Sequence, residues 1–130
     1  MGWYVSSKKA NYSLQDVPEV RIKSRLKKIE IEGYSRMPNP GDFYEDLIVQ
    51  LKDCYKSFNH TLILDFKFEY INTSSGKWLL VLFNSLDPLI NEGIIEINWY
   101  YEEDDESILE AGEIYKSSSK MPFHLKKIVL

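Results

Sequence analysis

The segment from Leu62 to Phe83 constrains the fold more than any other part of this sequence. Apolar and polar residues alternate from Leu62 to Tyr70, as is typical of a strand with one buried face. Four small polar residues, Asn72 to Ser75, follow the strand, and the apolar run Trp78–Phe83 then begins a helix. The four polar residues therefore lie at a strand-to-helix junction, beside the unpaired N–H groups of a helix N-terminus.

The rest of the chain repeats this pattern of strands and helices. Hydrophobic periodicity predicts further strands at 17–22, 28–32, 94–101 and from 123 onward, and helices at 43–58, 74–91 and about 108–115. We expect Gly33 to end the second strand and Asp42 to cap the first helix.

The element order is therefore ββαβαβαβ. Strands joined through helices pair in parallel, whereas the opening two strands form an antiparallel hairpin. We predict an α/β fold in which three amphipathic helices pack on a mixed sheet of about five strands. At 130 residues the chain is expected to form a single domain over 1–130, with residues 1–13 as a loose N-terminal arm.

The helix predicted at 74–91 differs in kind from the other two. Six apolar residues in a row, 78–83, are followed by Leu86, Leu89 and Ile90. A helix that buries one face does not need apolar residues all round. Either the domain covers both sides of this helix, or one side contacts another protein. Pro88 is expected to unwind its last turn.

Composition disfavours several classes of protein. The net charge of −4 argues against nucleic-acid binding, and the alternate basic residues at 21–28 fit the outer face of a hairpin. No apolar run has the length of a membrane span, and residues 1–10 lack the apolar core of a signal peptide. The single cysteine, Cys54, excludes an internal disulfide and fits a buried or half-buried helix position. We predict a cytoplasmic bacterial protein.

No catalytic pattern is evident, so we expect neither an enzyme nor a cofactor. Gly76-Lys77 lacks the preceding glycine and the following Ser or Thr of a phosphate-binding loop. His60, His124 and Cys54 form no nucleophile pattern. The acidic run 102–106 fits a solvated turn at a helix N-terminus, or an acidic patch that contacts a partner, better than a metal site.

The stretch Asn72-Thr73-Ser74-Ser75 allows two interpretations. One such residue suffices for a helix cap, which contributes about 1 kcal/mol. Four of them would also suit regulation, because a phosphate adds about −1.5 to −2 charges beside the positive end of the helix. A partner bound at the same corner would then meet new charge and bulk. The residues alone leave both interpretations open.

Three blocks of the sequence resemble the SiaC-type regulatory phosphoproteins of bacteria, whose fold is similar to the STAS-like anti-anti-sigma proteins. The blocks are Pro18-Glu19-Val20 with 29–35, then 68–77, and then 98–106 with Glu110-Ala111-Gly112-Glu113. Pro122-Phe123 also fits, so the resemblance extends from about residue 17 to 125.

The resemblance implies a partner-switching module. A dedicated kinase would phosphorylate Thr73, a PP2C-type phosphatase would reverse the reaction, and one phospho-form would bind an effector, with a diguanylate cyclase of cyclic di-GMP signalling as the candidate. The rest of the helix N-terminus would contact the partner, through Asn72, Ser74, Ser75, Gly76 and Lys77.

Two alternatives accompany this interpretation. Gly76 makes the motif similar to the Asp-Ser-Ser-Gly of anti-anti-sigma factors, in which a serine is phosphorylated, so Ser74 is the alternative phosphosite. The other alternative is a structural dimerising domain in which residues 72–75 are only a helix cap.

Overall fold

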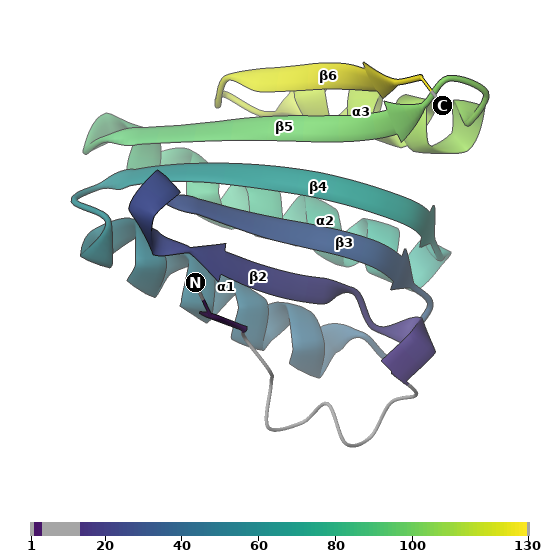
Figure 1. The fold of residues 1–130 in the computed structure, drawn as a ribbon, viewed down its shortest axis with the longest axis horizontal. Coiled ribbons are helices and arrows are strands. Elements are labelled where there is room, and N and C mark those ends of the chain that lie inside the picture. The colour runs from purple at the N-terminus through teal and green to yellow at the C-terminus, as the bar shows by residue number, and fades with distance from the viewer. Residues whose placement is uncertain (1, 4–13, 130) are drawn as a thin grey trace.

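The computed structural model describes residues 2–3 and 14–129, which form a six-stranded sheet with three α-helices (Figure 1). The strands are β1 (Gly2–Trp3), β2 (Glu19–Lys23), β3 (Lys28–Ser35), β4 (Thr61–Ile71), β5 (Ile94–Glu102) and β6 (Phe123–Ile128). The helices are α1 (Gly41–Ser57), α2 (Thr73–Leu86) and α3 (Glu106–Ser118), with short 3₁₀ segments η2 (Leu14–Asp16), η3 (Ser24–Leu26) and η4 (Asp87–Asn91). All five predicted strands and all three predicted helices are confirmed.

The predicted N-terminal arm, 1–13, is described only at residues 2–3. These two residues form β1, which pairs antiparallel with β2 and is the added sixth strand. Residues 1 and 4–13 lie outside the described residues, so the remainder of this prediction is untested.

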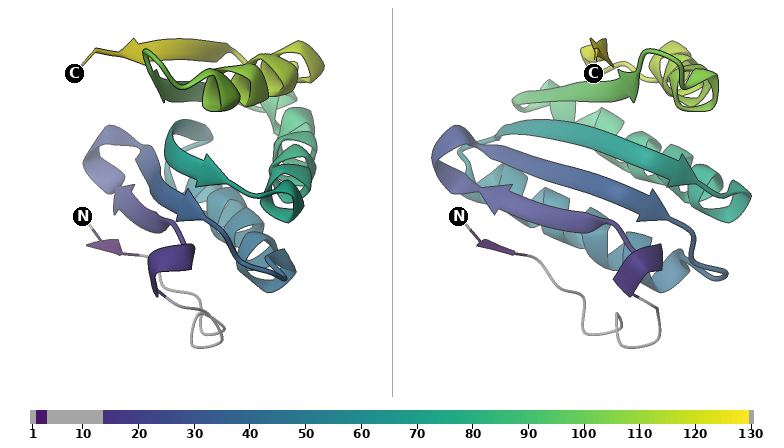
Figure 2. Two further views of the ribbon diagram at one scale, coloured as in Figure 1. Left: turned by 90° about the vertical axis from the view of Figure 1, so that its right-hand side faces the viewer. Right: turned by 45° about the vertical axis from the view of Figure 1, so that its right-hand side comes forward.

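The order of strands across the sheet is the order of strands along the chain. β1, β2 and β3 pair antiparallel, and β3 to β6 pair in parallel through crossovers that contain α1, α2 and α3. Right-handed crossovers that step in one direction across a sheet place their helices on the same face. All three helices lie on one face of this sheet, as the side views of Figure 2 show.

The core fills the space between the sheet and its layer of helices. Strand residues of one parity face the helices, and register aligns them across the sheet, as in Ile31, Phe66 and Trp99 on neighbouring strands. Trp99 is fully buried, and its indole N–H donates to the carbonyl of Ile108 on α3 at 2.8 Å. A Cβ added at Gly112 would lie 2.4 Å from Trp99 Cδ1, so only glycine fits where α3 crosses the indole.

Two predicted boundaries are wrong and one is confirmed. β3 continues past Gly33, which takes a positive φ of 115° at a register irregularity instead of ending the strand. Asp42 lies in the first turn of α1, whose N-cap is Pro40, because the loop reaches helical geometry two residues earlier than expected. Pro88 does unwind the last turn of the second predicted helix, 74–91, since α2 ends at Leu86 and a 3₁₀ segment follows.

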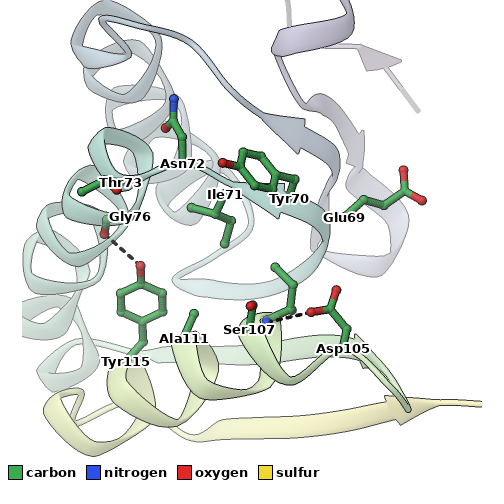
Figure 3. Close-up of a pocket in the computed structure, with 11 residues that line it drawn as sticks. Glu69, Tyr70, Ile71, Asn72, Thr73, Gly76, Asp105, Ser107, Ala111 and Tyr115 are labelled. Carbon is green, nitrogen blue, oxygen red and sulfur yellow. Dashed lines mark hydrogen bonds between the residues drawn. The ribbon is translucent and has the colours of Figure 1, made fainter.

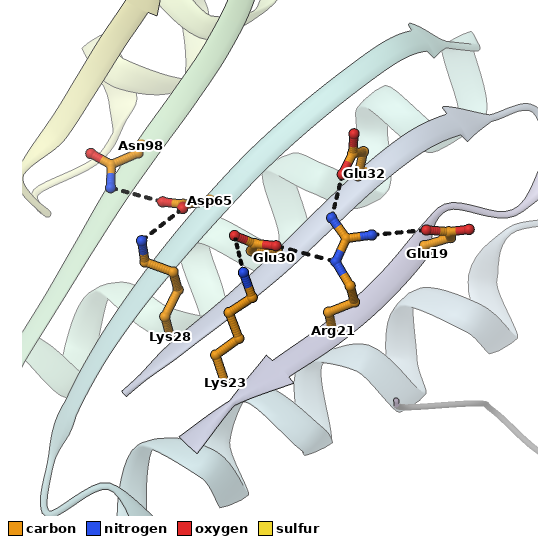
Figure 4. A network of polar contacts seen from close by, with 8 residues as sticks. All are labelled: Glu19, Arg21, Lys23, Lys28, Glu30, Glu32, Asp65 and Asn98. Atoms are coloured by element: carbon orange, nitrogen blue, oxygen red, sulfur yellow. Dashed lines mark hydrogen bonds and ion pairs between the residues drawn. The ribbon is translucent and has the colours of Figure 1, made fainter. Parts of the chain in front are cut away.

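The sheet face opposite the helices carries charged residues that neutralise one another (Figure 4). Arg21 on β2 bonds Glu19, Glu30 and Glu32, and Lys23 bonds Glu30 at 3.0 Å. Burial alone would raise the pKa of Glu30, but its bonds to Lys23 and Arg21 outweigh this effect and lower it. These pairs account for Arg21 and Lys23 of the hairpin, whereas Arg25 and Lys27 lie in the turn between the two strands.

A second polar group on this face is more deeply placed. Asp65 is 2% exposed, receives a hydrogen bond from Asn98 at 2.9 Å and pairs with Lys28 at 3.1 Å. A buried carboxylate is tolerated only with such partners. Cys54 is buried in α1, as predicted, and no helix within the described part of the chain has the length and apolarity of a membrane span.

Candidate functional site

The junction between β4 and α2 assigns a structural role to Asn72. Asn72 has extended backbone geometry, and its Oδ1 accepts the backbone N–H of Ser75 at 2.9 Å, so Asn72 is the N-cap of α2. Its Nδ2 also donates to the carbonyl of Met37 at 3.0 Å. One side chain therefore ends the strand, starts the helix and fixes the loop between β3 and α1.

Ser75 also has a structural role. It is fully buried, and its hydroxyl accepts a hydrogen bond from Ser35 at 2.8 Å. Since Ser35 has one proton to give, the 2.6 Å contact between its hydroxyl and that of Tyr44 is a bond donated by Tyr44. Burial raises the pKa of Tyr44, which keeps this phenol protonated. The predicted partner contact at Ser75 is therefore closed off by the β3 and α1 residues packed over it.

Thr73 and Ser74 are the exposed members of the motif. Neither side chain forms a hydrogen bond to another residue in the described ranges, so neither hydroxyl is needed for the junction. The two lie beside different hollows. Thr73 lines a pocket of about 400 Å³ between the β4–α2 junction and α3, which we call the α2–α3 pocket. Ser74 lines one of about 390 Å³ together with Lys77, Trp78 and the loop 38–41.

Tyr115 closes one end of the α2–α3 pocket (Figure 3). Its hydroxyl donates to the backbone carbonyl of Gly76 at 2.8 Å, and burial raises the pKa of Tyr115 to about 12. A Cβ at Gly76 would lie 3.4 Å from that hydroxyl, a contact that is close but ordinary. An alanine at position 76 would therefore fit beside Tyr115 without displacing it.

Asp105 stands on the opposite side of the same pocket. Its Oδ1 accepts the backbone N–H of Ile108 at 3.1 Å, so Asp105 caps α3, and Glu106 lies in the first turn. The acidic run thus forms a capped turn at a helix N-terminus, which is the first of the two arrangements that the sequence suggested for it. The described ranges contain no group of three His, Cys, Asp or Glu residues arranged to hold a metal.

Sequence reasoning missed Ser35, Tyr44 and Tyr115 as parts of this site. Tyr44 and Tyr115 were assigned to apolar helix stripes, and their hydroxyls are the overlooked signal: a buried tyrosine requires a hydrogen-bond partner. Ser35 gave no signal in the sequence, because its partner Ser75 lies 40 residues away.

The apolar character of α2 has mainly a structural cause. Leu79, Leu82, Phe83 and Leu86 are buried, and α2 lies between α1 and α3 (Figure 2). Only Leu80, at 37% exposure, and Val81, at 44%, form a large apolar ridge on its outer side. Of the two explanations offered by the sequence, coverage by the domain accounts for most of the run.

Comparison with known proteins gives consistent results. The family model described as SiaC family regulatory phosphoprotein matches residues 11–128. An uncharacterized protein of Pseudomonas aeruginosa (strain UCBPP-PA14) is 21% identical over 113 residues, which cover 86% of this chain and 90% of that protein.

Solved structures show the same fold. SiaC in the crystal structure of diguanylate cyclase SiaD in complex with its activator SiaC, from Pseudomonas aeruginosa, has a TM-score of 0.78 at 20% identity, with 89% of this chain and 96% of that chain covered. The crystal structure of apo-SiaC from the same organism has a TM-score of 0.77 at 19% identity, with 97% and 99% covered. The mixed sheet with three helices predicted from the sequence is thus the architecture of these structures, and it is compatible with the predicted STAS-like relationship.

Proposed function

The chain belongs to the SiaC family of regulatory phosphoproteins, and from this premise we propose that it is the phosphorylated switch component of a partner-switching pathway. Thr73 is the switch residue. A Ser/Thr protein kinase phosphorylates it, a PP2C-type phosphatase removes the phosphate, and the phosphorylation state controls binding to an effector. The protein itself has no catalytic role in this scheme.

One observation carries the choice of Thr73. Of the four polar residues at the start of α2, Asn72 and Ser75 are committed to the cap and to the buried network. Thr73 is exposed, is not needed by the fold, and stands at the N-terminus of a 14-residue helix, where added negative charge is favoured. A kinase can reach this hydroxyl without opening the domain.

The proposed effector is a diguanylate cyclase. SiaC of Pseudomonas aeruginosa is the activator of diguanylate cyclase SiaD in their solved complex. In this chain the surface next to Thr73 would make the contact: the outer ridge of α2, with Lys77, Leu80 and Val81 exposed. A phosphate at the start of the same helix would place charge at the edge of that contact.

Ser74 is the second candidate, because it shares the exposure of Thr73 and lines a pocket with Lys77, a cation three residues away. Phosphosite mapping by mass spectrometry on the protein from its own cells, growing and starved, separates the two. We expect phosphate on Thr73 with an occupancy that changes with condition. Phosphate on Ser74 alone would transfer the switch to that residue, and an unmodified 72–75 stretch in every condition would contradict the proposal.

A binding experiment tests the consequence of the modification. Once a candidate cyclase from the same genome is in hand, its affinity for the unmodified protein and for protein phosphorylated at residue 73 is measured by calorimetry. Thr73→Ala should bind like the unmodified protein and should not respond to the kinase, whereas Ser74→Ala should respond like the wild type. Equal affinity of both phospho-forms for the effector would refute the switch.

A further inference from the structure

β6 is the last strand of the sheet and lies at its edge, with β5 as the one strand beside it in the described part of the chain (Figure 1). Where this pairing begins, the Ile97 N–H donates to the Pro122 carbonyl at 2.9 Å. Where it ends, the Glu103 N–H donates to the Ile128 carbonyl at 3.1 Å. In a parallel ladder, every second residue of a strand directs its backbone groups to the same neighbour. Residues 124, 126 and 128 therefore face β5.

The backbone groups of Phe123, Leu125 and Lys127 face the other way, out of the edge of the sheet. Within the described ranges, none of their N–H or carbonyl groups has a hydrogen-bond partner. The register is continuous along β6, so these donors and acceptors form a regular row about 20 Å long. Such a row is able to pair with an added strand.

The side chains of β6 differ on the two faces of the sheet. On the face opposite the helices, Lys126 is exposed, and its ammonium lies 5.8 Å from the centre of the Tyr100 ring. No carboxylate of the described residues pairs with Lys126. On the helix side, half-buried Leu125 contacts Gly112 of α3, and half-buried Leu109 lies three residues before this glycine on the same side of the helix. An added strand would therefore meet a cation on one face and leucine side chains on the other.

We propose that β6 binds an extended segment of a partner protein, which adds a strand to the sheet and carries acidic and apolar residues in alternation. The backbone of this segment pairs with Phe123, Leu125 and Lys127. Its acidic side chains lie beside Lys126, where a cross-strand pair of opposite charge is favourable, and its apolar side chains lie beside Leu125. This edge contains none of the residues at the start of α2, so it is an interaction surface beyond that of the proposed switch.

A second copy of this chain fits the edge less well than an acidic segment does. β6 contains two lysines, one histidine and no acid, so two copies could not neutralise each other. An antiparallel pairing centred on Lys126 would place the two copies of this lysine directly opposite each other, which is destabilising. Lysines on edge strands commonly prevent such self-pairing. The same charges favour a segment that carries acids.

The test is an NMR titration of the full ¹⁵N-labelled chain with the blocked peptide acetyl-Val-Glu-Val-Glu-Val-Glu-amide. We expect saturable binding in which the amides of Phe123, Leu125 and Lys127 become protected from hydrogen exchange, because only these outward N–H groups gain a hydrogen bond. The amides of residues 124, 126 and 128 should be protected already in the free protein. The peptide with lysine in place of glutamate should bind more weakly by about threefold, the ratio expected for one cross-strand charge pair.

Matched variants separate the backbone of the edge from its side chains. Lys127→Pro removes one outward N–H and keeps the bonds to β5, because proline is tolerated on an edge strand where its nitrogen faces away from the ladder. Lys127→Ala removes the same side chain and keeps the N–H. We expect Lys127→Pro to bind the glutamate peptide about fivefold more weakly than Lys127→Ala, the ratio for one hydrogen bond. Lys126→Gln should weaken the glutamate peptide by about threefold and should not weaken the lysine peptide. The amide spectrum of each variant reports whether it is folded.

Shifts that do not saturate, no new protection at Phe123 and Leu125, or equal binding by Lys127→Pro and Lys127→Ala would overturn the inference. Equal binding of the two peptides would overturn the preference for an acidic segment. Protection of the outward amides that rises with protein concentration alone would assign the edge to a second copy of the chain, and would overturn the inference too. None of these outcomes depends on the phosphorylation of Thr73. A failed edge and a failed switch are therefore distinguishable.

Discussion

Because residues 72–75 have different roles, their substitution should change stability by different amounts. These amounts distinguish a switch residue from a residue that only caps the helix. Asn72→Ala removes the cap of α2, worth about 1 kcal/mol, and the bond to the Met37 carbonyl, worth about 1 kcal/mol more. We therefore expect it to lower the free energy of unfolding by about 2 kcal/mol. Thr73→Ala removes an exposed hydroxyl without a hydrogen-bond partner in the described ranges, so the change should stay within about 0.5 kcal/mol.

Two neighbouring variants complete the series. Ser75→Ala deletes a buried acceptor and leaves the proton of the Ser35 hydroxyl without its acceptor, which should cost about 1–2 kcal/mol. Ser74→Ala is the matched control for Thr73→Ala, because it too removes an exposed hydroxyl from the first turn of the same helix.

Urea-induced unfolding followed by tryptophan fluorescence measures all four changes, and comparison of midpoints is valid if the slopes agree. The reasoning predicts two stable variants at 73 and 74 and two destabilised variants at 72 and 75. If Thr73→Ala loses as much stability as Asn72→Ala, Thr73 is part of the structural cap. That result would refute the assignment of Thr73 as a switch residue that the fold does not need.

Three further predictions concern the core and the buried charges. Gly112→Ala places a Cβ against Trp99 and should lower stability by about 2 kcal/mol, seen as a lower Tm in calorimetry; an unchanged Tm would contradict the packing. Burial raises the pKa of Tyr115 to about 12, above about 10 in the unfolded chain. The contribution of the neutral phenol to the free energy of unfolding is therefore fully present below pH 10. Up to about 2–3 kcal/mol of that free energy is lost as pH rises from 10 to 12. Tyr115→Phe should reduce the loss of stability between pH 10 and pH 12. An unchanged dependence of stability on pH would show that this loss comes from other tyrosines. Lys28→Met removes the cation beside buried Asp65 and should cost about 3 kcal/mol in urea unfolding. Adding Asp65→Asn removes the unpaired charge but keeps an acceptor for the Asn98 amide, so it should restore most of this loss; no recovery in the double variant would count against an unpaired charge as the cause.

The fold was predictable because its signals are local. Alternation along 62–70 and the three-and-four spacing along 43–58 each report one buried face, and the rule for crossover connections then predicts which strands pair in parallel. The errors fall where two local signals compete. Gly33 suggests a stop, yet pairing with β4 carries β3 past it to Ser35. Asp42 suggests a cap, yet the helix starts before it.

The site was predictable in position but not in detail. The sequence predicts a helix N-terminus that carries several hydroxyl groups, and it predicts that one of the residues 72–75 caps this helix. Which residue caps, and which is buried, depends on Met37, Ser35 and Tyr44, which are remote in sequence and meet the motif only in the folded chain. The α2–α3 pocket likewise needs both helices in place, so no window of sequence could reveal it.

The agreement between strand order and chain order also affects how the protein is made. Every strand after the first pairs with the strand that precedes it in the sequence. On a ribosome, each strand would therefore find its partner already synthesised, and the sheet can grow one strand–helix unit at a time. Asn72 and Met37, which are joined by a hydrogen bond, both precede α3 in the sequence, so the junction at Thr73 can form before α3 exists. The α2–α3 pocket, by contrast, is complete only when α3 packs beside it, which makes this hollow one of the last products of folding.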